Sequence, residues 1–314
     1  MKTIYTSIFI LSAFFSFTQP KVKDFKPDIE AKKMFNTFKL KRLASNKNIC
    51  IPEVSITFIT RSNWSSTKSK GPNEATSKAY FVLNGIKKET YQSIANEAHD
   101  YFVKKLQSVG YNIIPYEQFT SHKKFEDLGE EIHPKEKEFK LSGFLDVIAK
   151  ITGATHGITF TAFNRPNFKD PIGTGNYMKE GKIAKSLDAA VAHLEITLEF
   201  MTYTVGKSRE YLFNQTNYSV SLESTPQLFI SNISLNMVGP DMYLGGINME
   251  VDNYYAVPKD YVNNFTMTDK YEGEGYSAGF YVINADDSKY KEAALANIKA
   301  YIDKMIELIV EHKN

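Results

Sequence analysis

The chain has 314 residues, of which 42% are hydrophobic and 13% aromatic, and this is enough apolar surface for a packed core. Its 38 lysines and arginines nearly balance its 36 aspartates and glutamates, so the net charge gives no reason to expect binding to DNA, RNA or an anionic membrane. The single cysteine, Cys50, excludes a disulfide within the chain.

The first 18 residues have the pattern of a secretory signal peptide. Lys2 supplies a positive charge, residues 4–17 are largely apolar, and Ser16 and Thr18 precede a possible cleavage site at Gln19. The apolar run is shorter than the roughly 20 residues that a membrane span needs. We therefore expect an exported protein, periplasmic or extracellular, without an integral membrane segment in the mature chain. Cys50 lies too far beyond the cut to carry a lipid anchor, and we expect it to be a buried, passive thiol.

Residues 19–50 form a polar segment with a helix expected near 29–43, and residues 51–314 form a single α/β domain. Apolar patterns predict strands at 54–60, 79–83, 111–114, 157–163, 190–205, 209–220, 227–238, 247–251 and 279–283. Apolar residues at helical spacing predict helices at 88–109, 142–151 and 289–312. Polar or glycine-rich stretches predict long loops at 61–78, 121–141, 164–186 and 240–278.

The long strand at 190–205 shapes the predicted architecture. Leu194 and Ile196 alternate with His193 and Glu195, so one face should pack on the core and the other should face water. A turn expected at Gly206 and Lys207 would fold this strand into a long hairpin. The predicted fold is therefore α/β, at the border with α+β: a mixed β-sheet flanked by helices, with a long antiparallel hairpin and a C-terminal helix.

Three junctions in this order carry a family resemblance. The helix that ends at Gly110 leads into residues 111–114, the segment 148–155 (IAKITGAT) leads into the strand at 157–160, and the hairpin covers 195–209. Together they span about half of the chain and resemble the periplasmic domain of the CsgG-like curli secretion lipoproteins and the amino-terminal domain of TolB. The resemblance implies a fold and an envelope compartment, but no secretion pore. In that family a lipid-bearing cysteine directly follows the signal peptide, where this chain has Gln19.

Motifs for metal or cofactor chemistry are absent from the sequence. The six histidines form no His-Glu-x-x-His pattern, and no phosphate loop, dinucleotide fingerprint or Gly-x-Ser-x-Gly elbow occurs. The weak metal candidate is His193 with Glu195 and Glu199, which share one predicted strand face. A solvated strand face explains the same pattern. The sequence therefore predicts no cofactor and no catalytic residue.

Aromatic residues are the unusual surface signal. Tyrosines crowd a glycine-rich stretch between 243 and 276, and the only tryptophan stands in a Ser- and Lys-rich segment. Such rings suit carbohydrate or protein recognition, although they could equally cover the edge of the sheet or the core. The predicted binding residues are Trp64, Tyr254, Tyr255, Tyr271 and Tyr276.

Three functions are compatible with these observations. The first is a non-enzymatic envelope or secreted protein that binds another protein or assembles with copies of itself. The second is an exported hydrolase that acts on glycan or peptide with carboxylates brought together from distant segments. The third is a glycan- or small-molecule-binding protein that uses the tyrosine-rich stretch.

Overall fold

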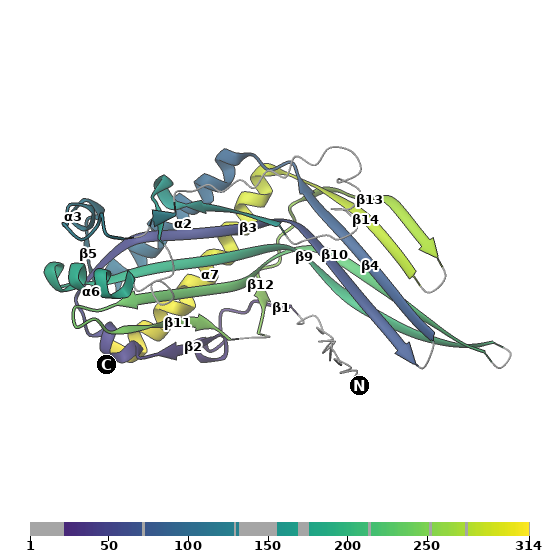
Figure 1. The fold of residues 1–314 in the computed structure, drawn as a ribbon, viewed down its shortest axis with the longest axis horizontal. Coiled ribbons are helices and arrows are strands. Elements are labelled where there is room, and N and C mark those ends of the chain that lie inside the picture. Colours follow the sequence, from purple (N-terminus) through teal and green to yellow (C-terminus); the bar gives the residue numbers. More distant parts are fainter. Residues whose placement is uncertain are drawn as a thin grey trace, which may run out of the picture.

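The computed structural model describes residues 22–70, 73–128, 130–131, 156–168, 176–212, 215–250, 253–273 and 276–313. The predicted signal peptide (1–18), the predicted helix at 142–151 and most of the predicted loop at 121–141 lie outside these ranges. Figure 1 shows a long, twisted sheet with two long helices packed along one half of it, while the other half extends beyond the helices as strands alone.

The helices flank one end of the sheet. Those in the described ranges are α1 (Leu40–Ala44), α2 (Lys88–Ser108), α3 (Tyr116–Thr120), α6 (Asn176–Leu187) and α7 (Asp287–Lys313), with 3₁₀ turns η1 (Ala31–Lys33) and η2 (Ala162–Asn164). The long helices α2 and α7 contact each other as well as the sheet. No helix in the part of the chain that the structure describes is long and apolar enough to cross a membrane.

The main sheet has ten strands in the order β13-β14-β4-β3-β9-β10-β11-β2, with β5 and β7 also paired to β3. Its strands are β2 (Phe35–Phe38), β3 (Asn48–Lys70), β4 (Asn73–Asn84), β5 (Asn112–Ile114), β7 (His156–Thr161), β9 (Ala190–Leu212), β10 (Gln215–Val238), β11 (Leu244–Met249), β13 (Val262–Gly273) and β14 (Tyr276–Ala285). Two small pairs join β1 (Lys23–Asp24) to β12 (Tyr255–Ala256) and β6 (Glu130–Glu131) to β8 (Asn167–Phe168).

The sheet contains both parallel and antiparallel pairs. Strand β3 is parallel to β9, and β4 is parallel to β14, whereas β9 and β10 form a long antiparallel hairpin. The fold is therefore the predicted one, a mixed sheet flanked by helices with a long hairpin and a C-terminal helix.

The main core lies between the sheet and the pair α2–α7. The predicted apolar stripe of α2 is buried, namely Tyr91, Ile94, Ala95, Ala98, Phe102 and Leu106. Gly110 follows the helix with φ +88°, a left-handed conformation that glycine adopts without steric cost, and its N–H bonds to the carbonyl oxygen of Gln107. The helical periodicity of this stretch and its C-terminal stop signal thus predict both the length and the buried face of α2.

A second, smaller core covers the opposite face of the sheet beneath α3 and α6. It is formed by Cys50, Phe119, Leu128, Ile183, Ala184 and Val191. Burial raises the pKa of the Cys50 thiol to about 12, so this cysteine stays protonated and packs as an apolar group. The prediction that this face of β9 meets water is wrong at His193, which is only 2% exposed because α6 lies over it.

The strands separate into two layers beyond the helices (Figure 1). Strand β3 pairs with β9 along 49–58 and then with β4 along 61–70, while β9 continues with β10 alone. Strand β10 also contacts β4 and β3 without pairing with them. The distal half is therefore a sandwich of the layer β13-β14-β4-β3 and the β9–β10 hairpin.

Three predicted loops contain regular structure. Residues 61–78 belong largely to the β3–β4 hairpin, 164–186 include most of α6, and 240–278 include β11, β12 and β13. In the described parts of these polar stretches, the backbone groups pair with neighbouring strands or within a helix. Polar composition therefore did not distinguish these elements from loops.

Two local predictions near the sheet edge and hairpin are also wrong. The helix expected near 29–43 is divided into η1, β2 and α1, because β2 adds to the edge of the sheet by pairing with β11. The turn expected at Gly206 and Lys207 lies inside β9, where Gly206 pairs with Ser221. A single glycine is tolerated in a strand interior and does not by itself mark a turn.

Candidate ligand-binding site

A cleft of about 340 Å³ opens between the first half of α2 and strand β7. Side chains with hydroxyl, amide or charged groups dominate its lining, which consists of Lys88, Glu89, Gln92, Ser93, Asn96, Thr159, Phe160, Thr161 and Asn164. The α2 residues come from the polar side of the helix, opposite its buried stripe. The cleft is therefore lined mainly by hydrogen-bonding groups, which helix α2 and strand β7 hold in place.

A strained turn closes one end of the cleft. Phe163 has φ 56° and ψ 26°, and Asn164 has φ 52°. Both are left-handed conformations that cost a residue with a side chain on the order of 1 kcal/mol, and asparagine tolerates them best. Strain of this kind persists only where surrounding contacts fix it, and such contacts often belong to functional sites.

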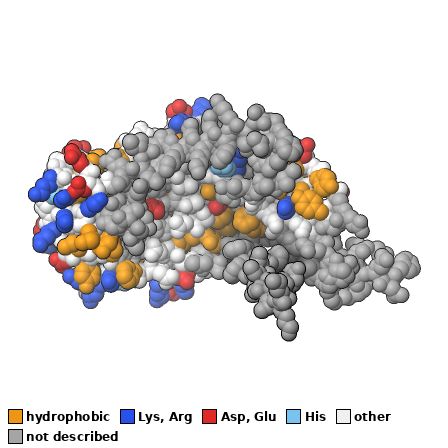
Figure 2. Space-filling model, in the orientation of Figure 1, with side chains coloured by type: hydrophobic (Ala, Val, Ile, Leu, Met, Phe, Trp, Pro, Cys, Tyr) orange, Lys and Arg blue, Asp and Glu red, His pale blue; other side chains and the backbone are white. Residues whose placement is uncertain are grey.

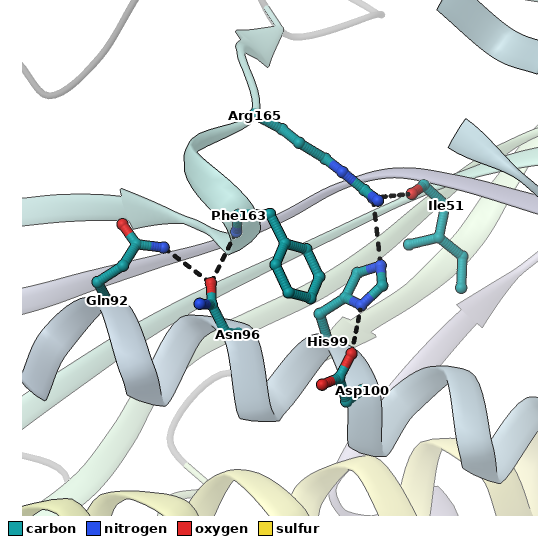
Figure 3. Close-up of polar contacts among 7 residues, drawn as sticks. All are labelled: Ile51, Gln92, Asn96, His99, Asp100, Phe163 and Arg165. Atoms are coloured by element: carbon teal, nitrogen blue, oxygen red, sulfur yellow. Dashed lines mark hydrogen bonds and ion pairs between the residues drawn. The ribbon is translucent and has the colours of Figure 1, made fainter. Parts of the chain in front are cut away.

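Two amide side chains of α2 hold this turn (Figure 3). The Phe163 N–H donates to Oδ1 of Asn96 over 2.7 Å, and Gln92 Nε2 donates to the same oxygen and to the carbonyl oxygen of Thr161, both over 2.8 Å. Gln92 and Asn96 are four residues apart and so lie on one side of the helix. Their side chains are fixed in orientation by the turn that they support.

The ring of Phe163 stands at the border of this site. It is 45% exposed and meets the His99 ring edge to face, with 5.0 Å between the ring centres. Figure 3 shows the ring between the side chains of Asn96 and His99, close against α2. The turn thus presents an aromatic surface next to the polar cleft.

A polar cluster fixes the far side of the turn. Nη1 of Arg165 donates to the carbonyl oxygen of Ile51 over 3.0 Å and lies 3.2 Å from Nε2 of His99, whose Nδ1 is 3.3 Å from Oδ1 of Asp100 (Figure 3). The Arg165 guanidinium also lies 4.1 Å from the centre of the Tyr116 ring. The arginine therefore ties the turn to β3, α2 and α3.

The protonation of His99 follows from these contacts. Burial lowers its pKa and outweighs the opposing hydrogen bond with Asp100. A neutral ring has one acceptor nitrogen, which faces the Arg165 donor, so the proton lies on Nδ1 toward Asp100. His99 thus serves as an acceptor that orients Arg165.

The predicted aromatic residues lie in three separate places. Trp64 is partly buried, with its ring centre 3.9 Å from that of Tyr203. Tyr255 is 8% exposed, and its neighbour Tyr254 packs on Phe229 near the core.

Tyr271 and Tyr276 lie elsewhere, on the β13–β14 hairpin. Their ring centres are 5.8 Å apart, and Tyr271 is 60% exposed. The structure therefore does not bring the five predicted binding residues together, and none of them lines the cleft.

The predicted metal candidate is divided between different environments. His193 lies between Glu53 and Glu180, with Nδ1 3.4 Å from the first carboxylate and Nε2 3.1 Å from the second, and all three side chains are at most 2% exposed. Glu199 instead accepts a hydrogen bond from Ser231 over 3.3 Å. In the described ranges, no group of three or more His, Cys, Asp or Glu residues has the geometry to hold a metal ion.

The ionic cluster Glu53–His193–Glu180 has a structural consequence. Burial opposes the charge on His193, but the two carboxylates outweigh it and raise its pKa to about 10. The imidazolium therefore joins α6 to β9 and β3 as a buried ion pair.

Sequence reasoning missed the cleft because its parts are distant in the chain. Gln92 and Asn96 are ordinary polar residues of an amphipathic helix, and residues 161–165 read as the end of a strand followed by a loop. Two sequence features could have indicated the site. They are the amide residues Gln92 and Asn96, four positions apart, and the Asn-Arg-Pro run at 164–166 after β7.

Comparisons with protein-family models, curated proteins and solved structures give no match. The functional assignment of this cleft therefore rests on its geometry.

Proposed function

We propose that the chain is an exported, non-enzymatic binding protein that holds a glycan in the cleft between α2 and β7. The observation that carries this proposal is the fixed pair Gln92 and Asn96, whose side chains are oriented by their hydrogen bonds to the strained turn. Amide groups that are ordered before binding lose little conformational entropy when a ligand arrives. Sugar hydroxyl groups are matching donors and acceptors for amide and hydroxyl side chains.

The exposed ring of Phe163 supports a sugar as the ligand. Recognition by an aromatic ring needs an exposed apolar surface next to polar groups, and Phe163 is 45% exposed beside the lining residue Asn164. The volume of about 340 Å³ is at the small end of ligand pockets, so the cleft would hold a short part of a chain.

The charges of the lining favour binding over hydrolysis. Glu89 is the one carboxylate among the lining residues that the structure describes. A glycosidase needs two carboxyl groups about 5 to 10 Å apart across the scissile bond. The hydrolase alternative therefore receives no support from this cleft.

Export is the part of the proposal that rests on the N-terminal sequence pattern. The kinship with CsgG-like and TolB domains likewise rests on the order of elements, and we retain it as a proposal about the core. Both are compatible with a protein that meets glycans in the cell envelope.

The test uses the side-chain amide signals of Gln92 and Asn96 in ¹⁵N-correlated NMR spectra. The probes are soluble peptidoglycan fragments and linear oligosaccharides of glucose and of N-acetylglucosamine. We expect saturable shifts of both side-chain signals with at least one probe. Absence of shifts with every probe would contradict the proposal.

The informative variant is Phe163→Gly, because glycine adopts the left-handed backbone of this position without strain and removes only the ring. We expect affinity for the glycan to fall about fivefold, since one stacked ring contributes on the order of 1 kcal/mol. Phe38→Ser, which removes a remote exposed ring, is the matched control and should bind as the wild type does. If the Phe163 variant binds the glycan with the affinity of the wild type, the ring is not part of the binding site.

Protein binding or self-assembly is a second candidate function, and the exposed side chains of β13 favour it. Met267 is 46% exposed and Tyr271 is 60% exposed on this outer strand. A bulge between Met267 and Asp269 and an ion pair between Lys270 and Glu272 are features that oppose pairing of strand edges. A partner would therefore use the side chains. Light scattering after size exclusion tests self-assembly, and a strict monomer at high concentration contradicts it.

A further inference from the structure

A patch of exposed apolar side chains lies at the end of the molecule that carries α6 and β2. Phe38 is 52% exposed, Met178 is 50% exposed and Met242 is 43% exposed, and they come from β2, α6 and the β10–β11 connection. We name these three residues, with Tyr243, the end patch. Figure 2 shows apolar side chains at the left end, with lysines, arginines and some acidic side chains around them; in Figure 1 this is the end with α6 and β2.

Several close contacts connect the elements that carry the end patch. A Cβ atom added at Gly181 of α6 would lie 2.5 Å from Cγ of Met242, and Met178 is three residues earlier on the same side of that helix. Nζ of Lys39 lies 4.9 Å from the ring centre of Phe38 and 5.2 Å from that of Tyr243. The four side chains therefore lie around Lys39 and Gly181 at one end of the molecule.

Two residues at this surface have strained backbones. Lys39 has φ 48° and Met242 has φ 58°, and neither is glycine. The left-handed conformation costs each of them free energy that a glycine would not lose. Backbone strain of this kind often occurs at functional sites.

The surroundings of the end patch are predominantly basic. The exposed or half-exposed cations on α6 and on the segment from β2 into α1 are Lys39, Lys41, Arg42, Lys179, Lys182 and Lys185. The acids nearby are fewer: Asp241 pairs with Arg42 over 3.0 Å, Asp127 attracts Lys179 and Lys182, Asp188 follows α6, and Glu180 is buried against His193. The nearly balanced charge of the whole chain therefore conceals a local positive excess.

We propose that the end patch docks on an anionic membrane surface. The three apolar side chains would enter the boundary between headgroups and acyl chains, and the surrounding lysines and arginines would contact lipid phosphates. Each basic residue near such a surface adds attraction that salt screens. The basic side chains favour an anionic partner by charge complementarity. Three separate exposed apolar side chains can insert into a fluid surface, which an apolar groove could not do. This docking is separate from the proposed glycan cleft between α2 and β7.

Vesicle flotation tests the proposal with the purified protein. The probes are phosphatidylcholine vesicles with and without about 30% phosphatidylglycerol, at low and at high salt. We expect binding to the anionic vesicles and little to the neutral ones. The double variant Phe38→Ser with Met178→Ser should bind the anionic vesicles at least about fivefold more weakly.

The matched control is the double variant Met267→Ser with Tyr271→Ser, which removes two exposed apolar side chains from β13 and should bind as the wild type does. Far-ultraviolet circular dichroism and the melting temperature verify that both variants are folded. Equal binding of the Phe38/Met178 variant would overturn the proposal in favour of adsorption by charge alone. A wild-type dimer that this variant converts to a monomer, without vesicle binding, would show instead that the end patch joins two copies.

Discussion

His193 and Glu180 meet in the interior of the protein, with Nε2 3.1 Å from Oε2, although they belong to β9 and α6. Glu53 of β3 lies 3.4 Å from the other ring nitrogen. A helix that the sequence did not predict is thus attached to the centre of the sheet by a buried ion pair. The pair positions α6, and with it the Met178 side chain of the end patch.

Removing one partner of this cluster should destabilise the fold strongly. In Glu180→Ala the imidazolium keeps one carboxylate, and a buried site loses both an ion pair and a hydrogen bond. We expect the free energy of unfolding in urea to fall by about 3 kcal/mol. Glu126→Ala, which removes an exposed acid, should change it by less than about 0.5 kcal/mol. A loss below about 1 kcal/mol for Glu180→Ala would show that the buried pair adds little to stability.

The pH dependence of stability should carry the signature of His193. Its pKa is raised from 6.5 to about 10 in the folded chain, so between these values the folded protein holds a proton that the unfolded chain releases. The contribution is complete below pH 6.5 and is lost as the pH rises toward 10. We expect the free energy of unfolding to decrease by about 3 kcal/mol between pH 6.5 and 9.5. His193→Gln should flatten this decline, and an unchanged slope would contradict the assignment.

Glu199 should affect stability at lower pH. Burial raises its pKa from 4.5 to about 7, against the hydrogen bond from Ser231. The folded chain favours the protonated carboxyl, so its contribution is present below pH 4.5 and is lost as the pH rises through 7. Glu199→Gln keeps an acceptor for Ser231 and removes the charge. We expect this variant to be more stable than the wild type by about 2 kcal/mol at pH 8, and nearly equal at pH 4. Equal stability at both pH values would refute a buried charge at this position.

Short-range patterns predicted the parts of the fold that depend on one segment. The stripe of α2 and its stop at Gly110 are local features, and so is the alternation that defines β9. Helix α6 was missed because the apolar residues that face its core, Ile183, Ala184 and Leu187, cover only one turn within a polar stretch. Its stability comes from a small core and an ion pair to strands that are distant in the chain.

The candidate site could not be predicted for a related reason. The Asn96 amide supports the backbone of Phe163 across 67 positions of sequence, and neither residue belongs to a motif. The tyrosine-rich stretch attracted attention by composition, yet its residues divide between the core and the β13–β14 hairpin. Composition identifies residue types, whereas a site depends on which elements the topology brings together.

Two glycines with positive φ provide a matched pair for backbone strain. Gly85 has φ +95°, and an added Cβ would lie 2.5 Å from the carbonyl oxygen of Ala285, whereas Gly110 has φ +88° and faces only Lys313 Nζ, at 3.5 Å. Both alanine variants adopt the unfavourable left-handed backbone, but only Gly85→Ala also forces two backbone segments apart. We expect losses of about 1 kcal/mol for Gly110→Ala and at least about 3 kcal/mol for Gly85→Ala in urea unfolding. Equal losses would mean that the chain near Ala285 yields easily.

Two buried tyrosines separate the effect of a hydroxyl group from that of its ring. Tyr290 is fully buried, and its hydroxyl has no hydrogen-bond partner in the described part of the chain. The Tyr301 hydroxyl accepts from the N–H of Tyr255 over 2.9 Å and donates to its carbonyl oxygen over 3.0 Å. Tyr301→Phe leaves a buried N–H unsatisfied and should lower the free energy of unfolding by about 2 kcal/mol. Tyr290→Phe removes only a desolvated group, so its stability should equal or exceed that of the wild type, as thermal unfolding would measure. A loss above about 1 kcal/mol in Tyr290→Phe would reveal a bound water or another partner for this hydroxyl.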